Sequence, residues 1–257
     1  FDAAALALVL ASLAALDARR RDASALLLAA AIALKSFPVL LLPVFLIHCP
    51  GGRARARFAA LALGPVAALL LPFAVHDPGA LRRELFGYGG VADLGWLGVV
   101  RAARWLAGGR LLRGEAAHWP VGVAVSKVVF LVAYAAALAW MARRRLDLRR
   151  AALLTLLLFL TFYGALSAQY LLWVVPLAAL RPDRFMAAHG AASTVALLGF
   201  YLLLAPGVLT PHAAAPMPRL AGVLWAAGGA AVLVTGLCWL ARLAGEEPRP
   251  RYDGVLA

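Results

Sequence analysis

Acidic residues, lysine and cysteine are all scarce in this chain. Its 257 residues include 12 Asp and Glu against 25 Lys and Arg, and only two of those cations, Lys35 and Lys127, are lysines. Only two cysteines occur, Cys49 and Cys238, and neither has neighbours with metal-ligand spacing. The chain also lacks GxSxG, HExxH, Walker A and paired-cysteine motifs. The sequence therefore gives no support to the soluble-enzyme classes that these motifs mark.

Apolar residues, by contrast, dominate the chain. They make up 64% of it, and the mean hydropathy is +0.86, which fits no soluble class and predicts an all-α, polytopic transmembrane helical bundle. The formal net charge of +13 comes from arginines in short loops between apolar segments. Membrane orientation and anionic lipid headgroups explain such loops better than nucleic acid does. Membrane lipids are therefore the expected partners, and nucleic acid is not.

Two apolar stretches, 23–48 and 151–180, have arginines outside both ends and polar residues in the middle. A single helix of 26 residues would be about 39 Å long, enough to cross a hydrocarbon core of about 30 Å. A single crossing, however, would leave some arginine-rich loops outside, against the positive-inside bias. We therefore expect each stretch to be a re-entrant hairpin of two short helices, with its tip beyond the membrane midplane and facing a polar cavity that opens outward.

The rest of the chain divides at its arginines, glycines and prolines. We expect a partial helix at 1–16, spans at 58–75, 122–142, 185–205 and 220–240, and a cytoplasmic tail at 241–257, all in one transmembrane domain. Residues 76–121 form the principal outer loop, with short interfacial helices expected at 81–86 and 97–106. Cys49 and Cys238 fall near the arginine-rich side, so both are expected to be free thiols in a reducing compartment.

Lys35 is the strongest candidate for a ligand-binding residue. It lies at the tip of the first hairpin, in Lys35-Ser36-Phe37-Pro38, and an ammonium in a partly dry cavity suits a phosphate or pyrophosphate. The alternative is a snorkelling lysine that marks a helix end. At the second tip, Gln169, Tyr170 and Trp173 offer hydrogen bonds and aromatic faces to a sugar, although Tyr and Trp also line membrane interfaces for other reasons.

The outer loop contains further charged candidates. Six arginines there run against the orientation bias, so a lipid phosphate, either of a phospholipid headgroup or of a bound substrate, is the expected partner. Asp77 and Asp93 are weak candidates for a general base, since a loop carboxylate is more often solvated or capping a helix. The arginine candidates for phosphate binding are Arg82, Arg83, Arg101 and Arg104.

Three segments together resemble a known superfamily. They are 35–39, which reads KSFPV, 88–98, which reads YGGVADLGWLG, and 167–173, which reads SAQYLLW and is followed by Pro176. In that order they resemble the GT-C superfamily of integral-membrane glycosyltransferases. The match is best to the bacterial family 87 group, of the alpha-mannosyltransferase type, and fainter to the glycosylphosphatidylinositol mannosyltransferase that uses dolichyl-phosphate mannose. The resemblance extends from Phe1 to about Arg242.

The resemblance implies a GT-C-like fold and a membrane enzyme that takes a hexose, with mannose as the expected sugar, from a polyprenyl-phosphate donor. It implies transfer to a glycan or glycolipid acceptor on the extracytoplasmic face of the plasma membrane. Lys35 would bind the donor phosphate, and Gln169, Tyr170 and Trp173 would contact the sugar or donor. The essential carboxylate of such enzymes lies in a first outer loop that has no counterpart here, so the general base is expected upstream of Phe1.

Two other interpretations of the sequence stay open. The same outward cavity would serve a membrane carrier or translocator that binds a lipid-linked sugar without reacting with it. The same sequence features are also expected of an inactive remnant without the catalytic loop, or of a scaffold whose hairpins pack together but bind no ligand. The sugar, the acceptor, the linkage, the oligomeric state and any need for a divalent metal are not specified by the sequence.

Overall fold

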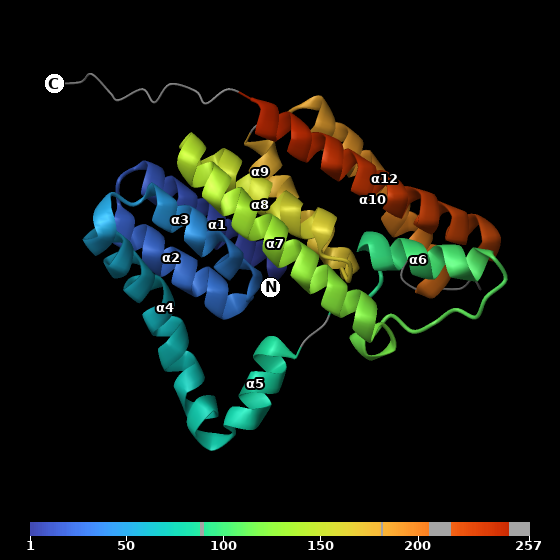
Figure 1. Cartoon of the computed structure of the whole chain (residues 1–257), viewed down its shortest axis with the longest axis horizontal. Helices are drawn as coiled ribbons and strands as arrows, with labels where there is room; N and C mark the ends of the chain where they lie inside the picture. Colours follow the sequence, from blue (N-terminus) through green and yellow to red (C-terminus); the bar gives the residue numbers. More distant parts are fainter. Residues whose placement is uncertain (88–89, 181, 206–216, 247–257) are drawn as a thin grey trace.

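The computed structural model describes residues 1–87, 90–180, 182–205 and 217–246 of the chain. Tyr88, Gly89, Arg181, Arg249 and Arg251, which were part of the sequence predictions, lie outside these described residues. Within them the chain is built from α-helices and short 3₁₀ helices, joined by turns and two isolated β-bridges (Figure 1). The predicted all-α helical bundle is therefore confirmed.

Among the described residues, four helices are long and apolar enough to cross a membrane. They overlap the four ranges expected from the sequence, and much of their surface is apolar. Phe73 and Val128, for example, keep 63% and 61% of their surface exposed, as expected for side chains that face lipid. The helices are α4 (Gly51–His76), α7 (Pro120–Arg144), α10 (Arg184–Leu204) and α12 (Pro218–Gly245).

The chain begins with two packed helices, α1 (Asp2–Asp17) and α2 (Arg21–Leu34). A tight turn joins them, in which Arg19 adopts a left-handed backbone conformation, with φ near 60°. Ser12 and Ser24 hold the pair together, because each hydroxyl donates a 2.8 Å hydrogen bond to the other residue's carbonyl. Such small polar contacts between helices suit a bundle whose surroundings are as apolar as its side chains.

Both apolar stretches fold back on themselves. After α2 the chain turns at Lys35 and returns through η1 (Phe37–Leu41) and α3 (Leu42–His48). The return brings Cys49 close to Arg21, at the start of α2. Burial raises the pKa of the Cys49 thiol, and the Arg21 charge opposes that rise. After α8 (Leu148–Phe162) it turns and returns through η3 (Ala168–Val174) and α9 (Val175–Ala179), both of which contact α8. Each return arm starts as a 3₁₀ helix and becomes α-helical around a proline, Pro43 or Pro176.

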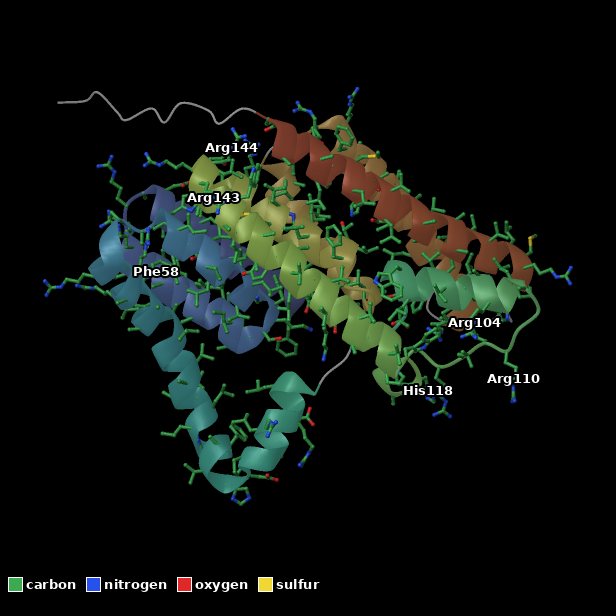
Figure 2. All side chains as sticks on the ribbon, viewed as in Figure 1. Phe58, Arg104, Arg110, His118, Arg143 and Arg144 are labelled. Atoms are coloured by element: carbon green, nitrogen blue, oxygen red, sulfur yellow. The ribbon has the colours of Figure 1, made fainter. Side chains whose placement is uncertain are left out.

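The turns that carry the arginines meet at one end of the bundle, which we call the arginine end (Figure 2). Here His48 Nε2 lies 2.8 Å from the carbonyl of Leu146, which joins the first return arm to the start of α8. Arg150 donates to the carbonyls of Leu243 and Glu246, at the end of α12. Ion pairs connect Arg57 with Asp22 and Arg149 with Asp17. The hairpins thus return to the end from which they start.

This arrangement predicts that cysteines placed at Arg53 and Arg143 are either both labelled or both protected when a membrane-impermeant maleimide is added to sealed vesicles. Both positions are exposed, and both lie at the arginine end. A cysteine at Arg110, at the opposite end in Figure 2, should respond in the opposite way. The background is Cys238→Ser, because Cys238 is exposed whereas Cys49 is buried. Labelling of only one of positions 53 and 143 in sealed vesicles would contradict the hairpin topology.

The opposite end carries α5 (Pro78–Phe86), α6 (Gly95–Leu106) and η2 (Ala116–His118). α4 leaves the bundle and forms a V with α5, whereas α6 lies against α12 (Figure 1). The segment before α6 docks on the second hairpin tip, because Leu94 and Leu166 exchange backbone hydrogen bonds of 2.9 and 3.4 Å. Gly95, with φ of 70°, permits this approach, since a Cβ there would lie 2.7 Å from the carbonyl oxygen of Gly164.

Candidate functional site

The first predicted site residue, Lys35, forms an ion pair with Asp2. Its Nζ lies 3.0 Å from Asp2 Oδ1, and the two side chains retain 30% and 16% of their surface exposed. Asp2 lies in the first turn of α1, and Lys35 is the C-cap of α2. Each charge is therefore at the helix end where the helix dipole favours it. The pair is therefore partly shielded from solvent, and both charged side chains keep some accessible surface.

Trp173 links this pair to the second hairpin. Its indole Nε1 donates a 2.9 Å hydrogen bond to Asp2 Oδ2, so one carboxylate holds both Lys35 and Trp173. The ring stacks on Phe37 with centroids 3.9 Å apart, and Tyr170 lies 4.2 Å away. Residues predicted from two separate hairpin tips are thus brought together. We call the group Asp2, Lys35, Phe37, Tyr170 and Trp173 the tip site.

The depth of the tip site follows from helix lengths. Fourteen helical residues separate Lys35 from the turn at the arginine end, which corresponds to a rise of about 21 Å. With a hydrocarbon core of about 30 Å, we expect the tip site to lie beyond the midplane on the side opposite the arginine end. Charged side chains at that depth are costly, and those that occur usually belong to functional sites. The position of the tip site is therefore typical of a functional site.

The three residues predicted to contact a sugar differ in accessibility. Trp173 and Tyr170 are buried, packed against Phe37 and Phe159, so their rings support the Asp2–Lys35 pair. Gln169 is exposed beside them on η3. Gln169 and Lys35 are therefore the polar side chains that keep accessible surface at the two tips, and the aromatic rings pack between the hairpins.

Asp93 and Arg101, predicted as a candidate base and a candidate phosphate ligand, bind each other. Arg101 Nη1 lies 3.1 Å from Asp93 Oδ1, and its Nε donates a 2.6 Å hydrogen bond to the carbonyl of Leu112. Burial raises the pKa of Asp93, which the neighbouring guanidinium opposes, and burial likewise lowers the pKa of Arg101. Trp225 Nε1 also donates to the Asp93 carbonyl. This buried pair fixes the outer loop against α12.

The other outer-loop candidates lie on exposed elements. Asp77 caps α5, because its side chain accepts a 2.8 Å hydrogen bond from the Ala80 amide. Arg82 and Arg83 are exposed on α5, which lies away from the bundle (Figure 1). Arg104 is exposed, with its guanidinium over the Trp119 ring at 6.0 Å from the centroid. Within the described part of the chain, these arginines form no ion pair.

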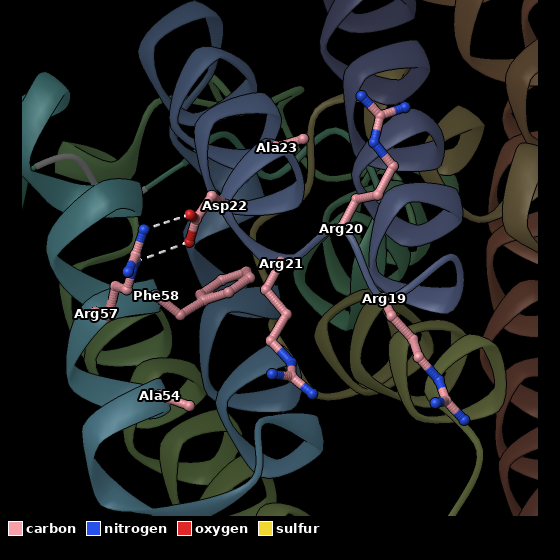
Figure 3. A pocket seen from close by; sticks show the side chains of 8 residues that line it. All are labelled: Arg19, Arg20, Arg21, Asp22, Ala23, Ala54, Arg57 and Phe58. Atoms are coloured by element: carbon pink, nitrogen blue, oxygen red, sulfur yellow. Dashed lines mark hydrogen bonds and ion pairs between the residues drawn. The ribbon is translucent and has the colours of Figure 1, made fainter.

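A cavity of about 500 Å³ lies at the arginine end, at the other end of the bundle from the outer-loop candidates (Figure 3). Its charged lining includes one acid, Asp22, which Arg57 engages through two nitrogens at 3.0 and 2.5 Å. The exposed arginines 19–21 in this lining can meet anionic lipid headgroups, as basic groups near a membrane surface do. The lining residues are Arg19, Arg20, Arg21, Asp22, Ala23, Ala54, Arg57 and Phe58.

Comparisons with protein-family models, with curated proteins and with solved structures find no match to this chain. Function is therefore argued from the site itself. Among the described residues, no three His, Cys, Asp or Glu side chains group in a way that suits a metal ion. The tip site, in contrast, combines one cation, one carboxylate and one indole donor within hydrogen-bonding distance.

Asp2 was not among the predicted site residues, although the sequence carries a signal for it. α1 runs 16 residues to the turn at 18–20, and α2 runs 14 residues back. Two antiparallel helices of nearly equal length place their far ends at the same depth. Asp2 is the first residue of α1 and Lys35 follows the last residue of α2. An acid and a base at matching depths in apolar helices predict a pair.

Proposed function

We propose that this chain is a membrane hexosyltransferase that uses a polyprenyl-phosphate sugar as its donor. The observation that carries the proposal is the ion pair between Lys35 and Asp2, held by Trp173 where the tips of two hairpins meet. A single ammonium at that depth suits the phosphate of a lipid-linked donor, whose chain lies in the bilayer. The resemblance to GT-C enzymes supports a hexose, with mannose as the first choice.

Transfer with inversion assigns a definite task to Lys35. An acceptor hydroxyl oxygen attacks C1 of the sugar, the bond from C1 to the phosphate oxygen breaks, and polyprenyl phosphate leaves with the bonding electrons. The ammonium of Lys35 stabilises the negative charge that develops on this leaving group. The Gln169 amide, which is exposed on the second tip, is proposed to bind sugar hydroxyls.

Asp2 is assigned to pairing with Lys35, for which it competes with the donor phosphate, rather than to proton removal. In an inverting displacement the base and the leaving group lie on opposite faces of the sugar carbon, and in inverting glycosidases the two carboxyl groups are about 6.5–9.5 Å apart. Asp2 is only 3.0 Å from Lys35, so both lie on the leaving-group side. By the resemblance, the acceptor proton passes to a separate carboxylate of an outer loop, on the opposite face of the sugar.

The positive-inside bias supports a cytoplasmic arginine end and therefore an extracytoplasmic tip site. The proposed location is the plasma membrane, with the donor and a glycan or glycolipid acceptor reaching the site from the outer leaflet. Phospholipid headgroups at the arginine-lined cavity are the proposed partners on the other side.

The test uses the full chain in vesicles with polyprenyl-phosphate [³H]mannose and a bacterial membrane lipid extract as the source of acceptors. We expect radiolabel in a new, more polar product and an equal amount of released polyprenyl phosphate. A carrier would instead move the intact donor across the vesicle membrane without forming a product. Neither reaction, with no binding of the donor, would overturn the proposal.

Replacement of Asp2 by asparagine is expected to lower the donor KM about two- to fivefold. A partly exposed ion pair contributes about 0.2–1 kcal/mol, and the Asp2 carboxylate competes with the donor phosphate for Lys35 while it also repels that phosphate. The asparagine amide retains an oxygen acceptor for Trp173 Nε1. Initial rates measured over a range of donor concentrations check this, with Asp22→Asn at the arginine end as the control. An unchanged or raised KM would contradict the competition.

A further inference from the structure

A second, mostly apolar cavity of about 240 Å³ opens between the second return arm and α10. Leu172 and Val175 line it from η3 and α9, and both are among the strongly exposed apolar residues of the chain. Gly190 and Thr194, on the facing side of α10, are also exposed. The mouth of the cavity is therefore on the apolar lateral surface of the bundle, where membrane lipid rather than water is the surrounding solvent.

Two buried polar atoms in the wall of this cavity have no partner among the described residues. They are His189 Nε2 and Ser193 Oγ, and these side chains are 3% and 8% exposed. Four residues apart on α10, they lie on one face of the helix. Buried polar groups are nearly always hydrogen-bonded. Their presence in an otherwise apolar cavity points to a ligand with a polar group of its own.

The hydrogen bonds around His189 determine which kind of group it needs. Thr235 Oγ1 has a single proton and lies 2.7 and 3.2 Å from two backbone carbonyls of α12, those of Ala231 and Val232, to which we assign that proton. It therefore accepts at its 3.1 Å contact with His189 Nδ1, which carries the ring proton. Nε2 of this neutral imidazole is consequently an acceptor. A ligand that satisfies it must bring a hydrogen-bond donor, as a hydroxyl does.

The depth of the cavity agrees with a lipid whose hydroxyl is at the head of its chain. Asp183 caps α10 at the arginine end, and His189 is six residues further along, a rise of about 9 Å. That position is inside the hydrocarbon region but close to its edge. The indole of Trp239, whose Nε1 donates to Asp183 Oδ2 at 3.2 Å, forms part of the wall on the arginine side.

We infer that this cavity binds a lipid alcohol from the surrounding membrane. The apolar chain fills the space between Leu172, Val175 and Trp239, and the hydroxyl donates to His189 Nε2 while it accepts from Ser193 Oγ. The cavity is separate from the tip site and uses neither Lys35 nor Asp2. Binding therefore does not depend on the proposed transferase activity.

The test is photolabelling of the full chain in phosphatidylcholine vesicles with a diazirine-bearing, alkyne-tagged C16 alcohol. Its O-methyl ether, which accepts but does not donate a hydrogen bond, is the comparison probe. We expect the alcohol to label peptides from 171–178 and 186–197 at least fivefold more than the ether does. Equal labelling by both probes, or no labelling of these peptides, would overturn the inference.

Gly190→Leu is the decisive variant. A Cβ at Gly190 meets no atom within 4 Å, so a leucine there blocks the mouth without a clash in the bundle. We expect it to reduce labelling by the alcohol at least fivefold, whereas Gly64→Leu on α4, equally free of neighbours, leaves labelling unchanged. His189→Leu should abolish the preference for alcohol over ether. If that variant fails to fold, the Gly190 result decides alone, and undiminished labelling of Gly190→Leu rejects the site.

Discussion

Lys35→Met is expected to reduce sugar transfer by about 10- to 100-fold in the full, active chain. The methionine keeps the length and the apolar stem of the side chain but removes the ammonium. A hydrogen bond to a charged group contributes about 1.5–3 kcal/mol, and each 1.4 kcal/mol is a factor of ten. Because the charge acts on the leaving phosphate, the loss should appear in kcat as well as in kcat/KM.

The chain contains its own matched control for this substitution. Lys127, the only other lysine, lies in α7 and is half-buried in an apolar span. It is not part of the tip site, so Lys127→Met makes the same chemical change outside that group. It should leave transfer unchanged, and Lys35→Arg should retain part of it. Folding is followed by size-exclusion chromatography in detergent. If well-folded Lys35→Met turns over at the normal rate, Lys35 does not bind the phosphate.

Gly228→Leu is expected to destabilise the fold by about 3 kcal/mol, at the upper end of what overpacking costs. α10 and α12 pack more extensively than any other pair of described helices, and a Cβ at Gly228 would lie 2.4 Å from the amide nitrogen of Ala196 and 2.7 Å from its Cα. Neither is a flexible side-chain end that can move aside. The two helices must therefore separate.

The midpoint of thermal unfolding in detergent measures this effect. Gly64→Leu is again the control, because both glycines lie in apolar helices but Gly64 has open space around its Cβ position. Removal of a helical glycine there should be neutral or slightly stabilising. Equal midpoints for the two variants would mean that the close approach of α10 and α12 contributes nothing to stability.

Most of the architecture was predictable because it depends on apolar length and on where arginines interrupt it. The four long helices and the two turns back at Lys35 and near Ser167 follow from those features alone. The helical bundle is confirmed on this basis. The boundaries of the short elements were harder to predict, because the switch from 3₁₀ to α helix around Pro43 and Pro176 depends on packing against α8 and on local turn geometry.

The site was predictable only in part. Lys35 was identifiable because an intramembrane cation is rare, and Trp173 because it lies at the second tip. Both side chains bind the Asp2 carboxylate. This contact depends on the tertiary structure, because three separate segments must end at the same depth. Arg101 looked like a phosphate ligand in the sequence, yet the fold supplies it with Asp93 and backbone carbonyls. Sequence pattern does not distinguish those two environments.

The contacts at the arginine end also have a mechanical consequence. Residues of six helices are fastened there by side chains such as His48, Arg57, Arg149, Arg150 and Trp239, and α4 diverges from the bundle beyond them (Figure 1). These contacts therefore fix helices that are far apart in the sequence to one another. α4 in particular is anchored through its first half, because Phe58 and Ala62 are the buried residues of this helix.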